Sequence, residues 1–206
     1  MGRVFVLRHG RSLANERGVI ASRPTNARDA FGLTSRGRDQ VLRSIARARS
    51  RNALVPPLVL ISSPLLRARE SADAAAELLG VTPSVDERLT ERDFGDFELG
   101  SDRLYARVWE QDLRDPTHRL WGVESVAHVL RRAGALVAES SRPEEAPTLV
   151  LCTHGDVAST LLCAASGAPL GRHRQVGALR TGALATLRAT EPVLEALRTL
   201  DVTGVG

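Results

Sequence analysis

The sequence predicts an α/β fold with a mainly parallel central sheet and helices on both of its faces. Three runs carry this prediction: "RVFVLR" at 3–8, "PLVLISS" at 57–63 and "TLVLCTHG" at 148–155 are apolar along most of their length. Strands that are buried on both faces of a parallel sheet have this composition, whereas half-exposed strands alternate between apolar and polar residues. Segments with helical spacing of apolar residues separate the three runs, which favours helices between the strands.

Length and composition suit one domain. The chain has 206 residues, 43% of them hydrophobic, which is enough to bury a sizeable core. Aromatic residues make up only 3%, so Leu, Val and Ala must build most of that core. We expect a single domain over residues 1–206 with a small helical cap at about 91–121.

The elements follow one another with recognisable start and stop signals. Residues 12–33 are rich in Gly, Pro, Asn and Arg and predict a long loop. A helix follows Thr34, which suits an N-cap, and a second helix has Pro64 in its first turn and Gly80 at its end. The remaining expectations are a mostly extended stretch at 83–95, helices at 101–113, 123–140 and 156–166, a surface turn at 140–147, and strands at 182–189 and 193–200.

Charge and cysteine usage exclude several protein classes. All 28 basic residues are arginines, yet 24 acidic residues are interspersed among them and the net charge is only +4, so no nucleic-acid partner is expected. Cys152 and Cys163 are interpreted as buried thiols, and no zinc quartet or cofactor motif is present. The sequence has neither a signal peptide nor a run long enough to cross a membrane, so we expect a cytoplasmic protein.

Reactive residues gather where the predicted strands end. The first strand ends in Arg8 and His9, the third in His154 and Gly155, and the helix after the second strand carries Arg67. Ligands of open α/β sheets bind at the carboxyl ends of the strands. A single histidine after a strand is more often a turn residue, but two such histidines are harder to explain in that way.

These residue types suit phosphoryl transfer. A neutral imidazole can attack phosphorus, and guanidinium groups offer forked donors to phosphoryl oxygens. A protonated second histidine adds another donor to the charge that develops in the transition state. A carboxyl such as Glu91 can hand a proton to the leaving oxygen.

Several motifs resemble those of one family. "LRHGRSLAN" is similar to the signature of the histidine phosphatase superfamily, which includes the cofactor-dependent phosphoglycerate mutases. Further segments match the family in order: "LTSRGRDQV", "SSPLLRARESA", "LTERDFGDFE", "GVESV" and "VLCTHGDV". The resemblance spans residues 3 to about 166 and implies a phosphoglycerate mutase-like fold.

The resemblance also implies roles for individual residues. His9 is the phosphorylated nucleophile, and Glu91 falls at the position of the proton donor. The implied phosphate contacts are Arg8, Arg67, His154, Asn15 and the backbone N–H of Gly155, which opens a helix. No metal is needed, because the arginines and the second histidine take its place.

The chain departs from the family pattern at a few positions. Leu99 stands where a glycine is usual, Glu70-Ser71 replaces Gln-Thr, and an extra Val123 splits Gly-Glu-Ser. Asp156 lies beside the second histidine, where a small or apolar residue is common. A carboxylate there either repels an anionic substrate or raises the pKa of His154 and keeps it charged.

The expected function is metal-independent hydrolysis of a small phosphorylated metabolite through a phosphohistidine. The alternatives are a phosphoglycerate-type mutase and a non-enzymatic phosphate-binding or interaction protein. Mutases carry an inserted region, and the segment between Leu99 and Gly122 is short, which favours the phosphatase. A small phosphate ester is the expected partner, and a homodimer is the expected form if the chain assembles.

Substrate specificity is expected to lie in residues 17–31 and 101–121. Arg23 and Arg28, together with Arg103 and Arg107, are candidates to hold a second anionic group, the alternative being solvated surface arginines. Tyr105, Trp109 and Trp121 either form a lid or pack between helices. The other histidines, His118, His128 and His173, have no motif support and are interpreted as surface or core residues.

Overall fold

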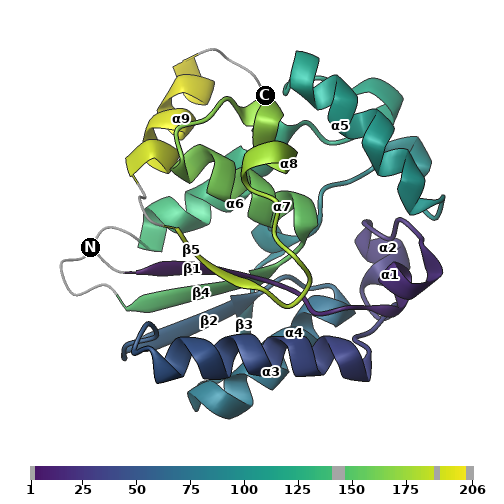
Figure 1. The fold of residues 1–206 in the computed structure, drawn as a ribbon. Coiled ribbons are helices and arrows are strands. Elements are labelled where there is room, and N and C mark those ends of the chain that lie inside the picture. The colour runs from purple at the N-terminus through teal and green to yellow at the C-terminus, as the bar shows by residue number, and fades with distance from the viewer. Residues whose placement is uncertain (1–2, 141–146, 188–190, 203–206) are drawn as a thin grey trace.

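A central sheet organises the protein (Figure 1). The computed structural model describes residues 3–140, 147–187 and 191–202. Within these ranges the sheet has five strands in the order β3-β2-β4-β1-β5. The strands are β1 (Val4–Arg8), β2 (Leu58–Ser62), β3 (Ser84–Val85), β4 (Thr148–Thr153) and β5 (Leu184–Leu187). All neighbouring strands pair in parallel except β1 and β5, so the predicted mainly parallel sheet is confirmed.

Helices cover both faces of the sheet, as predicted. Figure 1 shows α3 and α4 on one face, α6, α7 and α9 on the other, and α1, α2 and α5 beyond the carboxyl end of β1. The α-helices are α1 (Leu13–Arg17), α2 (Pro24–Ala27), α3 (Ser35–Ser50), α4 (Leu66–Leu79), α5 (Tyr105–Arg114), α6 (Val126–Ser140), α7 (Gly155–Ala165), α8 (His173–Val176) and α9 (Glu191–Val202). Short 3₁₀ turns are η1 (Glu87–Leu89), η2 (Gly95–Phe97), η3 (Asp102–Leu104), η4 (Leu120–Gly122) and η5 (Leu170–Arg172). In the described part of the chain, no helix has the length and apolar character of a membrane span.

The apolar runs arise because the inner strands are buried on both sides. Val4 and Val6 of β1 pack into the cluster under α6, α7 and α9. Phe5 and Leu7 face the opposite way, into the cluster under α3 and α4. Successive side chains of a strand point to opposite faces, so a doubly covered strand needs an apolar residue at every position.

The start and stop signals of α3 and α4 act largely as predicted. Thr34 Oγ1 accepts a hydrogen bond from the Gly37 N–H over 3.1 Å and caps α3. Gly80 ends α4 with φ of 68°, a left-handed conformation that costs glycine little. Helix α4 begins at Leu66, so Pro64 lies just before the helix and not in its first turn.

The strand predicted at 193–200 is wrong, since these residues lie in helix α9. Val193, Leu197 and Leu200 are spaced by four and three residues, which places them on one helical face. That face packs into the core cluster with α6 and α7. A short apolar run is compatible with a buried strand or with a helix, and the spacing of its apolar residues distinguishes the two.

Other boundaries differ in smaller ways. The predicted loop at 12–33 contains the short helices α1 and α2, and the stretch at 83–95 contains the two-residue strand β3, the 3₁₀ turn η1 and the first residue of η2. The helix predicted from 123 begins at Val126. Most of the surface turn predicted at 140–147 lies outside the described residues.

The region from 91 to 121 has an apolar cluster separate from those beneath the sheet. Ile20, Phe94, Phe97, Val108 and Val123 form its buried part. The region contains η2, η3, α5 and most of η4, so its regular structure is helical. Leu99 adopts a left-handed φ of 62°, which explains why a glycine is usual at this position.

Candidate active site

A pocket of about 190 Å³ lies at the carboxyl end of β1. Its walls come from residues far apart in the sequence. They are Arg8, His9, Ala14, Asn15, Ala21, Arg67, Glu91, Asp102, Tyr105, Trp109, Gly155, Asp156 and Arg174. Six of the predicted site residues are among them. His154 lies directly behind, with its ring centroid 5.1 Å from that of His9.

His9 is buried and its neutral tautomer is set by its neighbours. Nδ1 lies 2.7 Å from the Gly10 carbonyl, which only accepts hydrogen bonds, so Nδ1 carries the proton. Arg67 Nε donates to His9 Nε2 over 3.2 Å, which requires a lone pair on Nε2. Burial, Arg67 and Arg8 hold the pKa of His9 well below its usual 6.5. The ring therefore presents an unprotonated Nε2 to the pocket at neutral pH.

The loop after His9 is held by close backbone packing. A Cβ on Gly10 would lie 2.2 Å from the Gly37 carbonyl oxygen at the start of α3, so only glycine fits here. The Gly10 N–H donates to Ser71 Oγ over 3.1 Å. Ser71 therefore supplies the hydroxyl group that threonine would bring at this position.

Within the part of the chain that the structure describes, Arg8 and Arg67 carry N–H groups with no protein partner. Arg67 belongs to the first turn of α4, is only 4% exposed, and has an unpaired buried Nη1. Arg8 is anchored by a bond from Nη1 to the Leu179 carbonyl over 2.7 Å, while its Nε is buried and unpaired. Unpaired buried donors cost free energy, which an anionic ligand with several oxygens would recover.

His154 and Gly155 continue the site at the start of α7. His154 Nε2 forms a hydrogen bond with Ser63 Oγ over 2.7 Å, and its Nδ1 is buried without a partner. Burial, Arg67 and His9 lower the pKa of His154, which favours the neutral ring over the charged ring that was expected. Gly155 is the first residue of α7, where N–H groups have no partner within the helix and face anions well.

Asn15 lines the pocket from α1. Its Oδ1 accepts hydrogen bonds from the N–H and hydroxyl of Ser12, both over 3.1 Å. This capping box fixes the side chain, because the carbonyl oxygen is occupied. The amide NH₂ is left to donate to a ligand in the pocket.

Glu91 lies in the pocket wall between η1 and η2. Its Oε1 accepts a hydrogen bond from the Arg92 N–H over 3.0 Å. Burial and the charge of Asp156 raise the pKa of Glu91, although Arg67 and Arg8 act against this. A raised pKa favours the protonated carboxyl that a proton donor needs.

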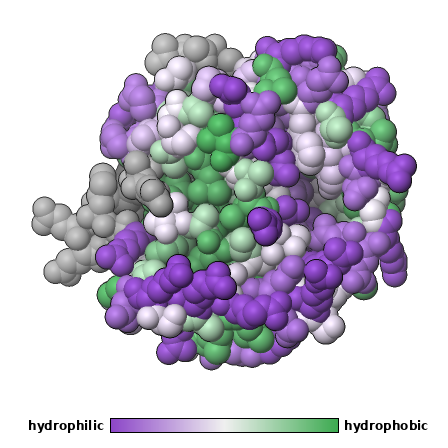
Figure 2. Space-filling model, in the orientation of Figure 1, coloured by the Kyte–Doolittle hydropathy of each residue, from purple (hydrophilic) through white to green (hydrophobic). Residues whose placement is uncertain are grey.

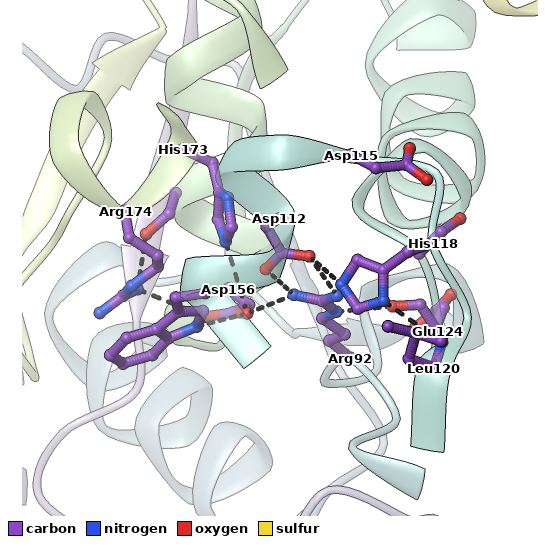
Figure 3. A network of polar contacts seen from close by, with 12 residues as sticks. Arg92, Asp112, Asp115, His118, Leu120, Glu124, Asp156, His173 and Arg174 are labelled. Carbon is purple, nitrogen blue, oxygen red and sulfur yellow. Dashed lines mark hydrogen bonds and ion pairs between the residues drawn. The ribbon is translucent and has the colours of Figure 1, made fainter. Parts of the chain in front are cut away.

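Asp156 is the centre of a buried polar network (Figure 3). Trp109 Nε1 donates to its carboxylate over 3.1 Å, and the network adds Arg92 Nη1 at 3.3 Å and Arg174 Nη1 at 3.5 Å. Burial alone would raise the pKa of Asp156, but His173, Arg174 and Arg92 outweigh burial and lower it. The carboxylate is therefore ionised and balanced by cations, so neither effect expected of it, repulsion or a raised His154 pKa, dominates the site.

Arg92 links this network to α5. The side chain is fully buried and donates to Asp112 through two bonds, over 2.6 and 2.8 Å. His118 Nε2 lies 2.9 Å from the same carboxylate. His118 and His173 are thus core histidines, whereas His128 is half-exposed and pairs with Glu124.

The arginines predicted to hold a second anionic group lie elsewhere. Arg23 pairs with Asp93 over 2.9 Å, and the exposed Arg28 pairs with Glu87 over 2.8 Å. Neither of them lines the pocket, and neither do Arg103 and Arg107. Ion pairing with acids of the same surface accounts for Arg23 and Arg28, which fits the alternative of solvated surface arginines.

Sequence reasoning missed two of the charged residues in or behind the pocket. Arg174 lies in the C-terminal part of the chain, outside the matched motifs. Arg92 lies within a matched motif, but no role was assigned to it. From residues 17–31 and 101–121, where substrate specificity is expected to lie, Ala21, Asp102, Tyr105 and Trp109 line the pocket. Trp121 instead packs against Phe97, with ring centroids 5.4 Å apart.

Two proteins of known name are similar to this chain in sequence. A glucosyl-3-phosphoglycerate phosphatase of Mycobacterium tuberculosis is 30% identical over 192 residues, covering 86% of this chain and 81% of that protein. A Salmonella choleraesuis protein whose name places it among phosphoglycerate mutases is 27% identical over 181 residues, covering 85% of this chain and 80% of that one.

A solved structure of mycobacterial glucosyl-3-phosphoglycerate phosphatase superposes with a TM-score of 0.74 at 26% identity, covering 90% of this chain and 92% of that one. Residues 4–199 match the model of the histidine phosphatase superfamily, branch 1. The protein is therefore a phosphoric monoester hydrolase that belongs to branch 1 of the histidine phosphatase superfamily.

Proposed function

We propose that the protein hydrolyses phosphomonoesters through a phosphohistidine on His9 and needs no metal ion for this step. The observation that carries the proposal is the unprotonated Nε2 of His9 beside Arg67, with unpaired N–H groups of Arg8 and Arg67 at the same site. A nucleophile that already lacks a proton can attack phosphorus directly. The guanidinium groups stabilise the negative charge on the phosphoryl oxygens during transfer.

Glu91 balances the protons of the two steps. In the first step His9 Nε2 forms a bond to phosphorus, the ester P–O bond breaks, and Glu91 protonates the leaving alcohol. In the second step the Glu91 carboxylate takes a proton from water, which attacks phosphorus and releases His9. Inorganic phosphate leaves, and Glu91 is protonated again for the next cycle.

Asn15, His154 and Gly155 complete the proposed phosphate site. Their donors toward the phosphate are the Asn15 amide, Nδ1 of His154 once the ring is protonated, and the backbone N–H at the start of α7. A bound phosphate dianion favours the protonated form of His154, because its charge opposes the effect of Arg67. His154 is then expected to gain a proton when the phosphate binds.

The size of the pocket suits a small metabolite. A volume of about 190 Å³ holds a phosphoryl group and a short alcohol part, and the alcohol can extend past Asp102 and Tyr105. We propose that residues 1–206 form a single domain in which residues 91–121 act as a cap over this opening.

A mutase is the second candidate, because one of the similar proteins has a mutase name. A mutase must keep its phosphohistidine away from water until the second substrate arrives. The polar pocket and the short cap region favour transfer to water instead. The two differ in product: the phosphatase releases inorganic phosphate, whereas the mutase returns an isomeric ester.

The test is hydrolysis of para-nitrophenyl phosphate in excess EDTA. The wild type should turn over and His9→Ala should not, while the half-exposed His128→Ala should behave as the wild type. Equal activity of the wild type and His9→Ala would end the proposal.

A cytoplasmic location, a homodimer and the lack of a nucleic-acid partner stay predictions from the sequence.

A further inference from the structure

A groove outside the candidate active site runs between helix α3 and strand β5. Two adjoining cavities of about 230 and 290 Å³ form it, and they share part of their walls. The first cavity begins where the Gly182 backbone packs on α3, since a Cβ there would lie 2.4 Å from Gln40 Cβ. This surface, which lies between residues 40–51 and residues 180–186, is named the α3–β5 groove.

The helix side of the α3–β5 groove is positively charged. Arg43, Arg47 and Arg51 follow one another at four-residue spacing, which places them on one side of α3, and Arg180 lines the first cavity with two of them. All four are exposed, and none forms an ion pair with an acidic residue of the described ranges. By contrast, Arg38 of the same helix pairs with an acidic residue of α4. The described residues that line the two cavities include no carboxylate, so the groove favours a negatively charged occupant.

The strand side of the α3–β5 groove offers free backbone groups. The Arg8 N–H donates to the Ala183 carbonyl over 3.0 Å, so in the antiparallel pairing of β1 and β5 the backbone groups of Ala185 also face β1. Those of Leu184 and Thr186 then point away from β1, to the outer edge of the sheet. Within the described ranges β5 is the last strand on this side, and such an edge can pair with an extended peptide.

The two sides of the groove run in the same direction. Arg43 and Gly182 line the first cavity, whereas Arg51 and Thr186 line the second, so residue numbers rise together along both walls. Figure 2 shows this face of the protein, with apolar and weakly polar side chains over β5 and a strip of hydrophilic side chains along α3. A peptide that pairs with β5 would therefore lie along the row of arginines.

The spacing of the arginines suits alternate residues of such a peptide. Leu184 packs into the apolar cluster under α3 and α4, so its side of the sheet is the one that faces α3. A strand added beside β5 would likewise send every second side chain toward α3. These side chains are about 6.6 Å apart, and residues four apart on a helix are about 6 Å apart along its axis. Acidic side chains at alternate positions can thus meet successive arginines.

We propose that the α3–β5 groove binds an extended acidic segment of a partner protein, which adds a strand beside β5 with an acidic residue at every second position. Single-stranded nucleic acid needs exposed aromatic rings for stacking, and the aromatic residue among the described lining is Phe5, which is only 4% exposed. A second copy of the chain, paired edge to edge about a two-fold axis, would bring the α3 arginines of both copies together. The proposal does not depend on the phosphatase function.

The first experiment measures binding of a defined peptide to the whole protein. The probe is a fluorescein-labelled peptide of alternating Glu and Thr, eight residues long, and the readout is fluorescence anisotropy at about 0.15 M NaCl. Saturable binding with a Kd below about 0.5 mM is expected. A peptide of alternating Lys and Thr should not bind. Absence of binding by the Glu peptide, or equal binding of both peptides, would overturn the proposal.

Two variants of equal net charge test whether the groove is the binding site. The groove variant combines three substitutions beside β5: Arg43→Gln, Arg47→Gln and Arg51→Gln. The control variant combines three at exposed arginines outside the groove: Arg36→Gln, Arg103→Gln and Arg172→Gln. The groove variant should raise the Kd about ten- to a hundredfold, because each exposed ion pair contributes about two- to fivefold. Equal losses in the two variants, with folding checked by circular dichroism, would show an effect of net charge alone and contradict the proposal.

Pairing with the β5 edge is tested from both sides. Two further peptides carry N-methyl groups on every Glu nitrogen or on every Thr nitrogen. Alternate N–H groups of a strand point to the same side, so one of these peptides should bind like the parent and the other should lose most of its affinity. Thr186→Pro removes an outward N–H at an edge where proline is tolerated, and should raise the Kd of the parent about two- to tenfold. Equal affinities of the two methylated peptides would overturn the strand pairing.

A nucleic-acid partner is the competing outcome. A labelled single-stranded DNA of eight nucleotides is titrated in the same way with the wild type and the groove variant. The DNA should bind more weakly than the Glu peptide. Tighter binding of the DNA, lost in the groove variant, would assign the arginines to nucleic acid and overturn the proposal. Because none of these measurements uses turnover, their outcome is independent of the phosphatase test.

Discussion

Arg67 Nε donates a hydrogen bond to His9 Nε2 over 3.2 Å. The Arg67 guanidinium thus contacts the nitrogen that attacks phosphorus, and its positive charge keeps that nitrogen from taking up a proton. When a substrate enters, the guanidinium can turn its donors to the phosphoryl oxygens and leave Nε2 free. One residue therefore keeps the nucleophile unprotonated and then helps to bind the group that is transferred.

The buried histidines make stability depend on pH. The pKa values of His9 and His154 are lowered in the folded state, so below about pH 6.5 the unfolded chain binds protons that the folded chain does not. The free energy of unfolding should fall as the pH drops from 6.5 to 5, by up to about 1.4 kcal/mol per pH unit for each histidine. Glu91, whose pKa is raised in the folded state, opposes this loss of stability, because the folded chain takes up at most one proton there that the unfolded chain does not.

Urea denaturation across this range measures the effect. The loss of stability on acidification should be smaller in His154→Gln, which removes one of the two groups. It should be unchanged in the exposed Leu113→Ala, which removes no titratable group. A wild-type stability that rises steadily from pH 6.5 to 5 would show that the two rings are protonated in the folded state.

The role of Glu91 as proton donor predicts a dependence on the leaving group. Glu91→Gln cannot donate a proton, so hydrolysis of an alkyl phosphate should slow by about 10²- to 10⁴-fold. Hydrolysis of para-nitrophenyl phosphate should slow much less, because nitrophenolate leaves without a proton. Steady-state kinetics on both esters measure this, with the exposed Glu87→Gln as control. Equal losses on both esters would assign the proton donor to another group.

Asp156 should set the pH at which Glu91 loses its proton. The charge of Asp156 raises the pKa of Glu91, so Asp156→Asn should move the alkaline limb of kcat/KM to lower pH. The exposed Asp96→Asn should leave this limb in place. A limb that stays fixed in Asp156→Asn, in a variant that still folds, would show that Asp156 does not act on Glu91.

Arg92 should be among the residues most sensitive to substitution for stability. Arg92→Met leaves Asp112 buried without its two hydrogen bonds, and the free energy of unfolding should fall by about 3–5 kcal/mol. Arg198→Met removes only exposed pairs with Glu191 and Glu195 and should change it by less than about 0.5 kcal/mol. Chemical denaturation of both variants gives the comparison. Similar losses would contradict the buried network.

The left-handed conformation of Leu99 predicts a stabilising substitution. The side chain is 53% exposed, so Leu99→Gly loses little packing and relieves a backbone strain of about 1 kcal/mol. The melting temperature should rise slightly. Leu113→Gly, at an exposed position in α5, should instead lower stability by about 1 kcal/mol. A lower melting temperature in both variants would show that Leu99 is not strained.

The parts of the site predicted from the sequence are local ones. His9 and His154 were found because each follows a buried strand, and parallel strands deliver their carboxyl ends to one edge of the sheet. Arg67 was found because a helix starts directly after the next strand. These positions depend on neighbours within a few residues along the chain.

The parts that were not predicted depend on distant contacts. Arg92 meets Asp112 and Asp156, which lie 20 and 64 residues further along the chain. Arg174 reaches the pocket only because α8 packs beside α7, and no pattern in its own segment marks it. The strand wrongly predicted at 193–200 has a different cause, because the four- and three-residue spacing of its apolar residues indicates a helix without any distant contact.

The most direct test of the account is to trap the phosphorylated protein. The wild type is mixed with a phosphate ester in excess EDTA, quenched in alkali, where phosphohistidine persists, and digested for mass spectrometry. The account predicts one added phosphoryl group on the peptide that contains His9, and none there in His9→Ala. A phosphoryl group on another residue, or undiminished labelling and turnover in His9→Ala, would contradict it.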